Sequence, residues 1–163
     1  MSPEYKSWSF IGRRALVEDT ASHLKAARSV ILLGGPGLGK TSLANQALGQ
    51  IHESTLTFRI RATPAVSEVP YGALGVLLSE LDHQDLTHPM FVLQELGRHL
   101  ADQAAGRTVV LFVDNVEDLD EMSAVVVSQL VRQRAIVLLC TGGAIGRVAP
   151  EFSHLWREGA LAR

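Results

Sequence analysis

The chain has 163 residues, of which 47% are hydrophobic and 20% charged, so its composition excludes intrinsic disorder and favours one globular domain. A formal net charge of −2 gives no basic surface, and direct nucleic-acid binding by this segment is not expected. The single cysteine, Cys140, excludes an internal disulfide, and no stretch approaches the about 18 apolar residues of a membrane span. We therefore expect a cytoplasmic protein that makes no membrane contact.

The N-terminal residues are mostly polar and predict a loose arm over residues 1–9, ahead of a domain over residues 10–163. Apolar residues then recur at helical spacing from Leu16 to Ala27 and predict a helix. This helix leads into four consecutive apolar residues, Val30 to Leu33, which predict the first strand.

The segment after this strand, Gly34 to Thr41, matches the pattern G-x-x-x-x-G-K-[ST] in full. Glycines let successive N–H groups face phosphate oxygens, and the helix predicted to follow adds the positive end of its dipole. Lys40 is expected to reach the β- and γ-phosphates, and the Thr41 hydroxyl to ligate Mg²⁺. The alternative is a glycine-rich turn that binds nothing. The predicted phosphate-loop residues are Gly34, Gly35, Pro36, Gly37, Leu38, Gly39, Lys40, Thr41 and Ser42.

Alternating apolar residues over Leu56–Arg61 predict a second strand with one less buried face, as at a sheet edge. The following residues predict a loop over Ala62–Pro70, a helix over Tyr71–Leu81 and a polar connection over Asp82–Pro89. Apolar residues at helical spacing between Val92 and Leu100 predict another amphipathic helix, which should end near Gly106.

Two continuous apolar runs, Val109–Val113 and Ile136–Cys140, predict parallel strands that are covered on both faces. The helix between them has an apolar face from Met122 to Leu130, and Asp120 is placed as its N-cap. A short helix is expected around Phe152–Trp156, and no further strand is predicted after it.

The predicted fold class is α/β, a three-layer αβα sandwich around a mostly parallel sheet. Because only four strands are predicted, we expect the sheet to be truncated before its last strand and the sequence to be a fragment of a longer protein. An exposed edge at that place would favour self-association.

Asp114 closes the third predicted strand and is expected to hold Mg²⁺, although an aspartate there could instead simply cap a loop. The next residue, Asn115, can orient a water molecule but cannot take its proton. Glu117, Asp118 and Asp120 are the candidates to substitute as the base. Alternatively they form a solvated acidic loop with Asp120 as a helix cap, which we favour. The predicted catalytic residues are Lys40, Asp114 and Asn115, and the predicted metal ligands are Thr41 and Asp114.

Thr141 ends the strand expected beside the phosphate loop, and its hydroxyl would either sense a γ-phosphate or satisfy the backbone at the strand end. Arg147 and Arg13 are the candidate cations for the γ-phosphate and for a base edge. The six histidines show no ligand spacing, so zinc is not expected.

The following segments occur along the chain in this order: Phe10–Arg13, Gly34–Thr41, Glu68–Leu74, Val113–Asp120 with Ser123, and Leu155–Arg157. In this order they resemble the N-terminal ATPase domain of LuxR-type large ATP-binding transcriptional regulators, which belong to the STAND class related to AAA+ ATPases. The phosphate loop is specific only to P-loop proteins, whereas Gly12-Arg13 and Pro70-Tyr71 narrow the match.

The resemblance implies an additional-strand P-loop fold, in which the Thr141 strand inserts between the Asp114 strand and the first strand. It implies that the domain is a nucleotide-dependent switch. ADP would hold the domain in a closed state, and ATP would permit it to self-associate. It also implies a promoter-binding helix-turn-helix elsewhere in a longer protein. Ile11, Gly12 and Arg13 would lie against adenine, unless they form a simple turn before a helix.

The sequence departs from this family at two positions. Asn115 stands where a second acid is frequent, and Thr141 is followed by two glycines where an arginine is common. We therefore expect tight nucleotide binding with slow hydrolysis. The main alternative is an oligomeric AAA+ motor or loader with Arg147 or Arg157 as its arginine finger. A phosphotransferase, for which no arginine-rich lid is seen, and an interaction module with a vestigial site are less favoured.

Overall fold

The structure is a computed structural model and describes residues 5–81 and 87–163, with side chains from residue 13 onward. Its centre is a five-stranded sheet in the order β2-β3-β4-β1-β5, and every neighbouring pair of strands is parallel. The strands are β1 Ser29–Leu33, β2 Thr55–Arg61, β3 Thr108–Asp114, β4 Val137–Gly142 and β5 Leu161–Ala162.

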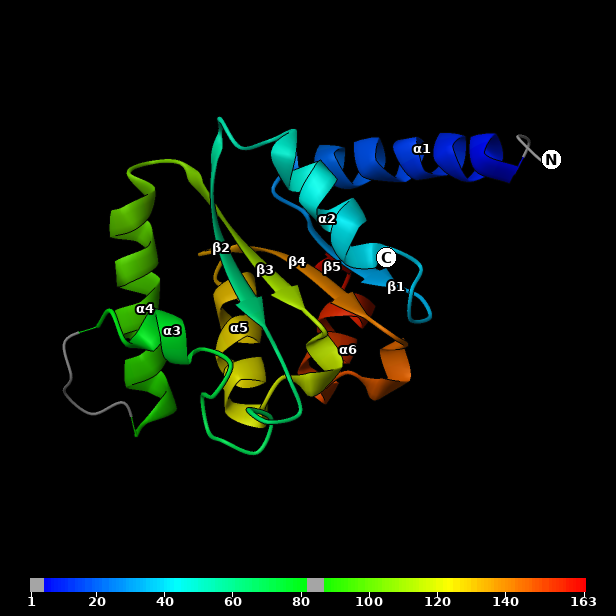
Figure 1. The fold of residues 1–163 in the computed structure, drawn as a ribbon. Helices are drawn as coiled ribbons and strands as arrows, with labels where there is room; N and C mark the ends of the chain where they lie inside the picture. Colours follow the sequence, from blue (N-terminus) through cyan, green and yellow to red (C-terminus); the bar gives the residue numbers. More distant parts are fainter. Residues whose placement is uncertain (1–4, 82–86) are drawn as a thin grey trace.

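Helices cover both faces of this sheet (Figure 1). Helices α1 and α2 lie on one face, and α3 to α6 lie on the other. Two short 3₁₀ turns, η1 and η2, follow β3 and β4. The bounds are α1 Tyr5–Lys25, α2 Lys40–Gly49, α3 Gly75–Leu78, α4 Pro89–Ala104, η1 Val116–Asp118, α5 Glu121–Arg132, η2 Ile145–Arg147 and α6 Pro150–Arg157.

Strand β3 shows how the sequence divides into two apolar layers. Val110 and Phe112 pack toward α1 and α2, whereas Leu111 and Val113 belong to the cluster on the other face. Successive strand residues point to opposite faces, so a strand buried on both needs an unbroken apolar run. Each side chain buried in this way contributes about 1.5–3 kcal/mol. The predicted three-layer αβα fold is therefore confirmed.

Strand order agrees with two further predictions. Strand β2 is at an edge of the sheet, and β4 lies between β3 and β1. The carboxyl ends of β3 and β4 are therefore brought beside the loop that follows β1, which is where the candidate site is built.

The structure corrects three boundaries. Tyr5–Ser9, expected in the arm, belong to α1, since no proline interrupts this stretch; residues 1–4 lie outside the described residues. Leu161–Ala162 form β5 beside β1 where no further strand was predicted, and two residues are too few to show a period. The predicted helix over Tyr71–Leu81 is confined to α3, Gly75–Leu78.

The shorter helix begins after Tyr71, which takes a left-handed backbone conformation with φ of 59°. The N–H groups of Tyr71 and Ala73 donate to the Asp120 carboxylate at 2.9 and 3.1 Å, which holds this segment against the start of α5. Residues 82–86 of the expected polar connection lie outside the described residues. Within the described residues, no helix is long and apolar enough to cross a membrane.

Three helices end in the same backbone motif. After α1, α5 and α6, a left-handed residue is followed by one whose N–H bonds back five residues, as in a Schellman motif. The left-handed residues are Ala27, Arg134 and Gly159, with φ of 54°, 57° and 74°. Only Gly159 is the residue type that takes this conformation without steric cost.

We predict that Ala27→Gly stabilises the protein. Removing the β-carbon relieves the left-handed strain by about 0.5–1 kcal/mol, which should raise the melting temperature by roughly 1 to 4 °C. The matched control is Ala101→Gly, at an exposed position inside α4, where glycine should destabilise by a similar amount. Thermal unfolding followed by circular dichroism measures both changes, and a lowered melting temperature for both variants would contradict the prediction.

Candidate functional site

The glycine-rich loop joins the carboxyl end of β1 to the first turn of α2. Gly37 and Gly39 both have φ of 76°, the left-handed region that favours glycine. The Gly34 N–H donates to the Gly142 carbonyl at 3.1 Å, so the loop is anchored to the end of β4. Helix α2 has Gly39 as its N-cap and no side-chain cap, which leaves its first N–H groups free of side-chain partners. This is a cradle suited to an anion.

Lys40 lies across this loop. Its Nζ donates to the carbonyl oxygens of Gly34 and Gly35 at 2.8 and 2.9 Å. Both acceptors are neutral backbone groups, and a phosphate would be a stronger partner for an ammonium group. The ammonium group is thus held beside the glycine-rich loop. Ser42 lies in the first turn of α2.

Asp114, at the carboxyl end of β3, connects the loop to β4. Its Oδ1 accepts from the Thr41 hydroxyl at 2.9 Å and from the Thr141 hydroxyl at 2.5 Å. Its Oδ2 is 3.2 Å from the Thr41 hydroxyl. Thr41 and Asp114, the two residues predicted to hold a metal, are therefore in direct contact. The buried Thr141 also bonds the Asp114 carboxylate and fixes its position.

A magnesium ion fits this arrangement by its chemistry. Thr41 and Asp114 offer a hydroxyl and a carboxylate, the hard oxygen donors that Mg²⁺ prefers, with substrate phosphate and water completing the shell. Over the described residues, no group of three or more His, Cys, Asp or Glu side chains could hold a metal without such help. The candidate metal position therefore depends on a phosphate ligand.

The acidic turn after β3 has two parts. Asp120 is 3% exposed, and its carboxylate accepts from Tyr71 N, Ala73 N, Ser123 N and the Ser123 hydroxyl. Its predicted helix-cap role is confirmed, and these four bonds occupy it fully. The contact with Tyr71 and Ala73 had no signal in the local sequence.

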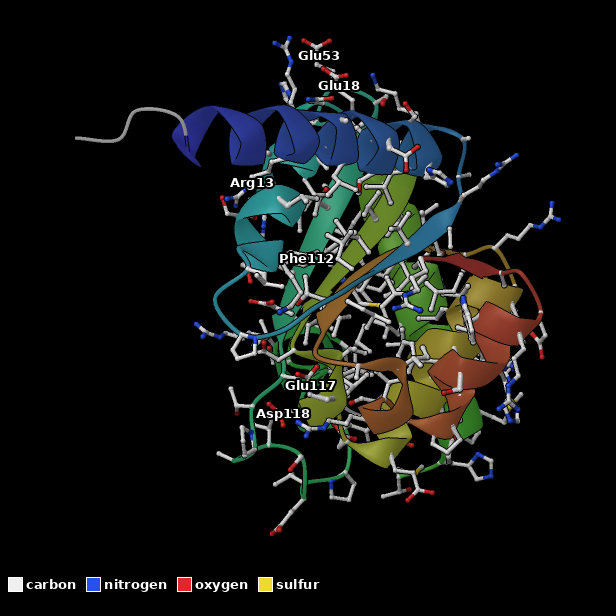
Figure 2. All side chains as sticks on the ribbon, turned by 90° about the vertical axis from the view of Figure 1, so that its right-hand side faces the viewer. Arg13, Glu18, Glu53, Phe112, Glu117 and Asp118 are labelled. Atoms are coloured by element: carbon white, nitrogen blue, oxygen red, sulfur yellow. The ribbon has the colours of Figure 1, made fainter. Side chains whose placement is uncertain are left out.

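Glu117 belongs to η1 and lies beside the connection from β4 to η2, with Asp118 next to it (Figure 2). A β-carbon at Gly142 would be 3.1 Å from Glu117 Oε2, so this carboxylate packs on the end of β4. Oε2 is buried and has no hydrogen-bond partner among the described residues. Asn115, just before η1, has φ of 58° and donates its N–H to the Thr141 hydroxyl at 3.2 Å.

Arg13 reaches the phosphate loop from α1 (Figure 2). Its Nη2 donates to the Gly39 carbonyl at 3.0 Å, and a β-carbon at Gly39 would meet that nitrogen at 2.5 Å. Ile11, Gly12 and Arg13 are all within α1, so the alternative of a simple turn before a helix is wrong. The side chain of Ile11 lies outside the described part of the chain. Arg147 is exposed on η2, at the same edge of the sheet.

Comparison with family models identifies the domain. Residues 22–144, more than half of the chain, match the model of an AAA domain. The chain belongs to the AAA domain family. No curated protein sequence matches this AAA domain.

Solved structures share the fold of this AAA domain. Drosophila ORC bound to AT-rich DNA and Cdc6 matches with a TM-score of 0.61 and 16% identity over 98% of this chain and 58% of the other. Cdc6p from Pyrobaculum aerophilum gives 0.59 and 16%, over 83% and 38%. The Thermotoga maritima RuvB Holliday junction branch migration motor gives 0.52 and 17%, over 86% and 42%. The AAA domain thus spans between 38% and 58% of these longer chains.

We predict that Lys40→Ala weakens binding of ATP and ADP to this AAA domain. A hydrogen bond to a charged group contributes about 1.5–3 kcal/mol, so affinity should fall about ten- to a hundredfold. Isothermal titration measures the change, and circular dichroism checks that the variant folds. Arg14→Ala, which removes an exposed positive charge from α1, is the control and should leave affinity unaltered. Equal affinities for Lys40→Ala and wild type would contradict the phosphate-loop assignment.

A second prediction separates two roles for Thr141. Because its hydroxyl bonds Asp114, Thr141→Val should raise the Mg²⁺ concentration needed for half-maximal binding about tenfold, for ATP and ADP alike. Thr141→Ser keeps the hydroxyl and should behave as wild type. Titrations with each nucleotide at several Mg²⁺ concentrations measure this. An effect on ATP alone would instead indicate a contact with the γ-phosphate.

Proposed function

We propose that this AAA domain is an ATP- and ADP-binding switch that hydrolyses ATP slowly with Mg²⁺ and belongs to a cytoplasmic transcriptional regulator. The observation that carries the proposal is the Asp114 carboxylate, which two threonine hydroxyls hold in place for a metal while the next residue is the amide Asn115. A site of this kind is built to bind nucleotide and is poorly equipped to remove a proton from water.

Each residue has one step in the proposed mechanism. Lys40 leaves the Gly34 and Gly35 carbonyls and pairs with the β- and γ-phosphates, and the first N–H groups of α2 receive the remaining oxygens. Thr41 and Asp114 would hold Mg²⁺, which would neutralise charge on the phosphate oxygens. Asn115 orients the attacking water. The adenine would lie against Ile11, Gly12 and Arg13.

The surroundings of Asn115 support slow turnover. Asp120 cannot act as the base, because its carboxylate is buried and accepts four hydrogen bonds. Glu117 packs on Gly142 at the end of β4, and no hydrogen bond joins its carboxylate to Thr41, Asp114 or Asn115 among the described residues. Hydrolysis then serves as a slow reset between an ATP state and an ADP state.

A physical connection leads from the nucleotide site to the surface. The Asp114 carbonyl accepts from Ala62 N at 3.0 Å, and Asp120, six residues further along, holds Tyr71 and Ala73. A shift of the turn after β3 would therefore move the segment from Ala62 to Ala73. Control of self-association and of promoter binding elsewhere in a longer protein rests on the family resemblance.

A second candidate is an oligomeric AAA+ motor or loader. Its support is the shared fold with the RuvB branch migration motor and the exposed Arg147 at the edge of the sheet that carries the site. Such a motor forms nucleotide-dependent rings and turns over steadily, with Arg147 or Arg157 completing a neighbouring site. Mass measurement in solution with ATP distinguishes the two, because rings would favour the motor.

We predict that Asn115→Asp accelerates hydrolysis. The change keeps the side-chain shape and the tolerance of a left-handed backbone, and it adds a base worth about 10²- to 10⁴-fold in rate. Single-turnover hydrolysis at saturating ATP and Mg²⁺ measures the gain, and Asp118→Asn in the same turn should leave the rate unchanged. Wild-type turnover above about 1 s⁻¹, in the ordinary range for enzymes, would overturn the slow-switch proposal.

A further inference from the structure

A cavity of about 700 Å³ lies at the opposite end of the sheet from the phosphate loop. Its wall includes Ser29 and Val137, the first residues of β1 and β4. The remaining wall comes from Ala162 of β5 and from the segments at the ends of α1, α5 and α6. The volume is within the range of about 300–1,000 Å³ that is usual for small-molecule sites.

The charged side chains around this cavity are unequal in sign. Three arginines, Arg28, Arg132 and Arg134, line it together with His23, whereas Glu158 is the one acidic residue in the described wall. Glu158 is already paired, since it lies 3.3 Å from both Nε and Nη2 of Arg132. Over the described residues, Arg28 and Arg134 have neither an ion pair nor a side-chain hydrogen bond. Two arginines of the wall therefore have a positive charge that no carboxylate of the described residues neutralises.

Basic residues are common where helices end, because they oppose the negative end of the helix dipole. That explanation leaves Arg28 and Arg134 without a hydrogen-bonding task. The Schellman bonds after α1, α5 and α6 already supply partners to carbonyls of His23, Leu130 and Leu155. Arg134 itself occupies the left-handed position of its motif, with φ of 57°, where a glycine would be the favourable choice.

Aliphatic residues from the ends of α1, α5 and α6 and from β4 and β5 also line the cavity. They would pack against the carbon skeleton of an organic ligand. The aliphatic residues of the wall are Ala26, Ala27, Val131, Ile136, Val137, Ala160 and Ala162.

We propose that this cavity binds a small organic dianion whose two acidic groups, carboxylate or phosphate, pair with Arg28 and Arg134. Each guanidinium presents a planar fork that matches either acidic group in a bidentate manner. The two arginines come from different elements, the end of α1 and the end of α5, so a bound dianion would bridge them. This site is separate from the nucleotide cradle and does not depend on the proposed function.

Amide chemical-shift mapping of the isotopically labelled full chain tests the proposal, with succinate and glycerol 3-phosphate as separate probes and ADP with Mg²⁺ present. We expect saturable shifts at Ser29, Ala135 and Ala160, and at least about tenfold weaker binding for Arg28→Ala and for Arg134→Ala. A response to one probe only would support the site and assign its acidic group. Lys25→Ala, an exposed charge near the cavity but outside its wall, is the control and should bind as wild type.

Three results would overturn the proposal: shifts that never saturate, shifts confined to Gly37 and Lys40 in the phosphate loop, or binding that both arginine variants retain. The arginines are exposed, so the variants should stay folded, and the dispersion of their spectra verifies this. Because each amide reports its own position, absence of nucleotide binding would be seen at the phosphate loop and would leave the cavity result standing.

Discussion

The Asp114 carboxylate accepts hydrogen bonds from two threonines that are 73 and 27 residues away in the chain. Through them it joins the start of α2, the end of β3 and the end of β4, the three elements that form the candidate site. A carboxylate in this position needs either donors or a cation, and the threonines supply the donors. The strand order, which puts β4 between β3 and β1, is what brings both hydroxyls within reach.

Asp120 also joins separate segments through its carboxylate, further from the nucleotide site. Its buried carboxylate satisfies the N-terminus of α5 and, from the segment before α3, the N–H groups of Tyr71 and Ala73. A group with four partners couples their positions, because moving one leaves a buried polar atom unpaired at a cost of about 1–3 kcal/mol. The Glu68–Leu74 and Val113–Asp120 motifs, which carried the family resemblance separately, are thus in contact.

Local patterns predicted the elements that depend on local causes. Apolar runs are sufficient for β1, β3 and β4, and the spacing of glycines and Lys40 is sufficient for the phosphate loop. The predicted bounds of the helix over Tyr71–Leu81 are wrong because the Tyr71 N–H bonds Asp120, which is 49 residues away in the chain. No local periodicity encodes that contact. The contact of Arg13 with Gly39, between residues 26 apart, was missed for the same reason.

The two ends of the parallel sheet differ in electrostatic character. At the carboxyl edge, α2 presents unpaired N–H groups, so an anion is attracted even before Lys40 contributes. At the amino edge, α1, α5 and α6 end, and their dipoles favour cations there, which explains why arginines are stable at that end. Backbone N–H groups already bond the terminal carbonyls of these helices. The helix dipoles therefore attract the arginines without neutralising their positive charge. Their guanidinium groups therefore remain free to pair with an anion. One sheet then attracts anions at both ends, through helix N–H groups and Lys40 at the carboxyl edge and through arginine side chains at the amino edge.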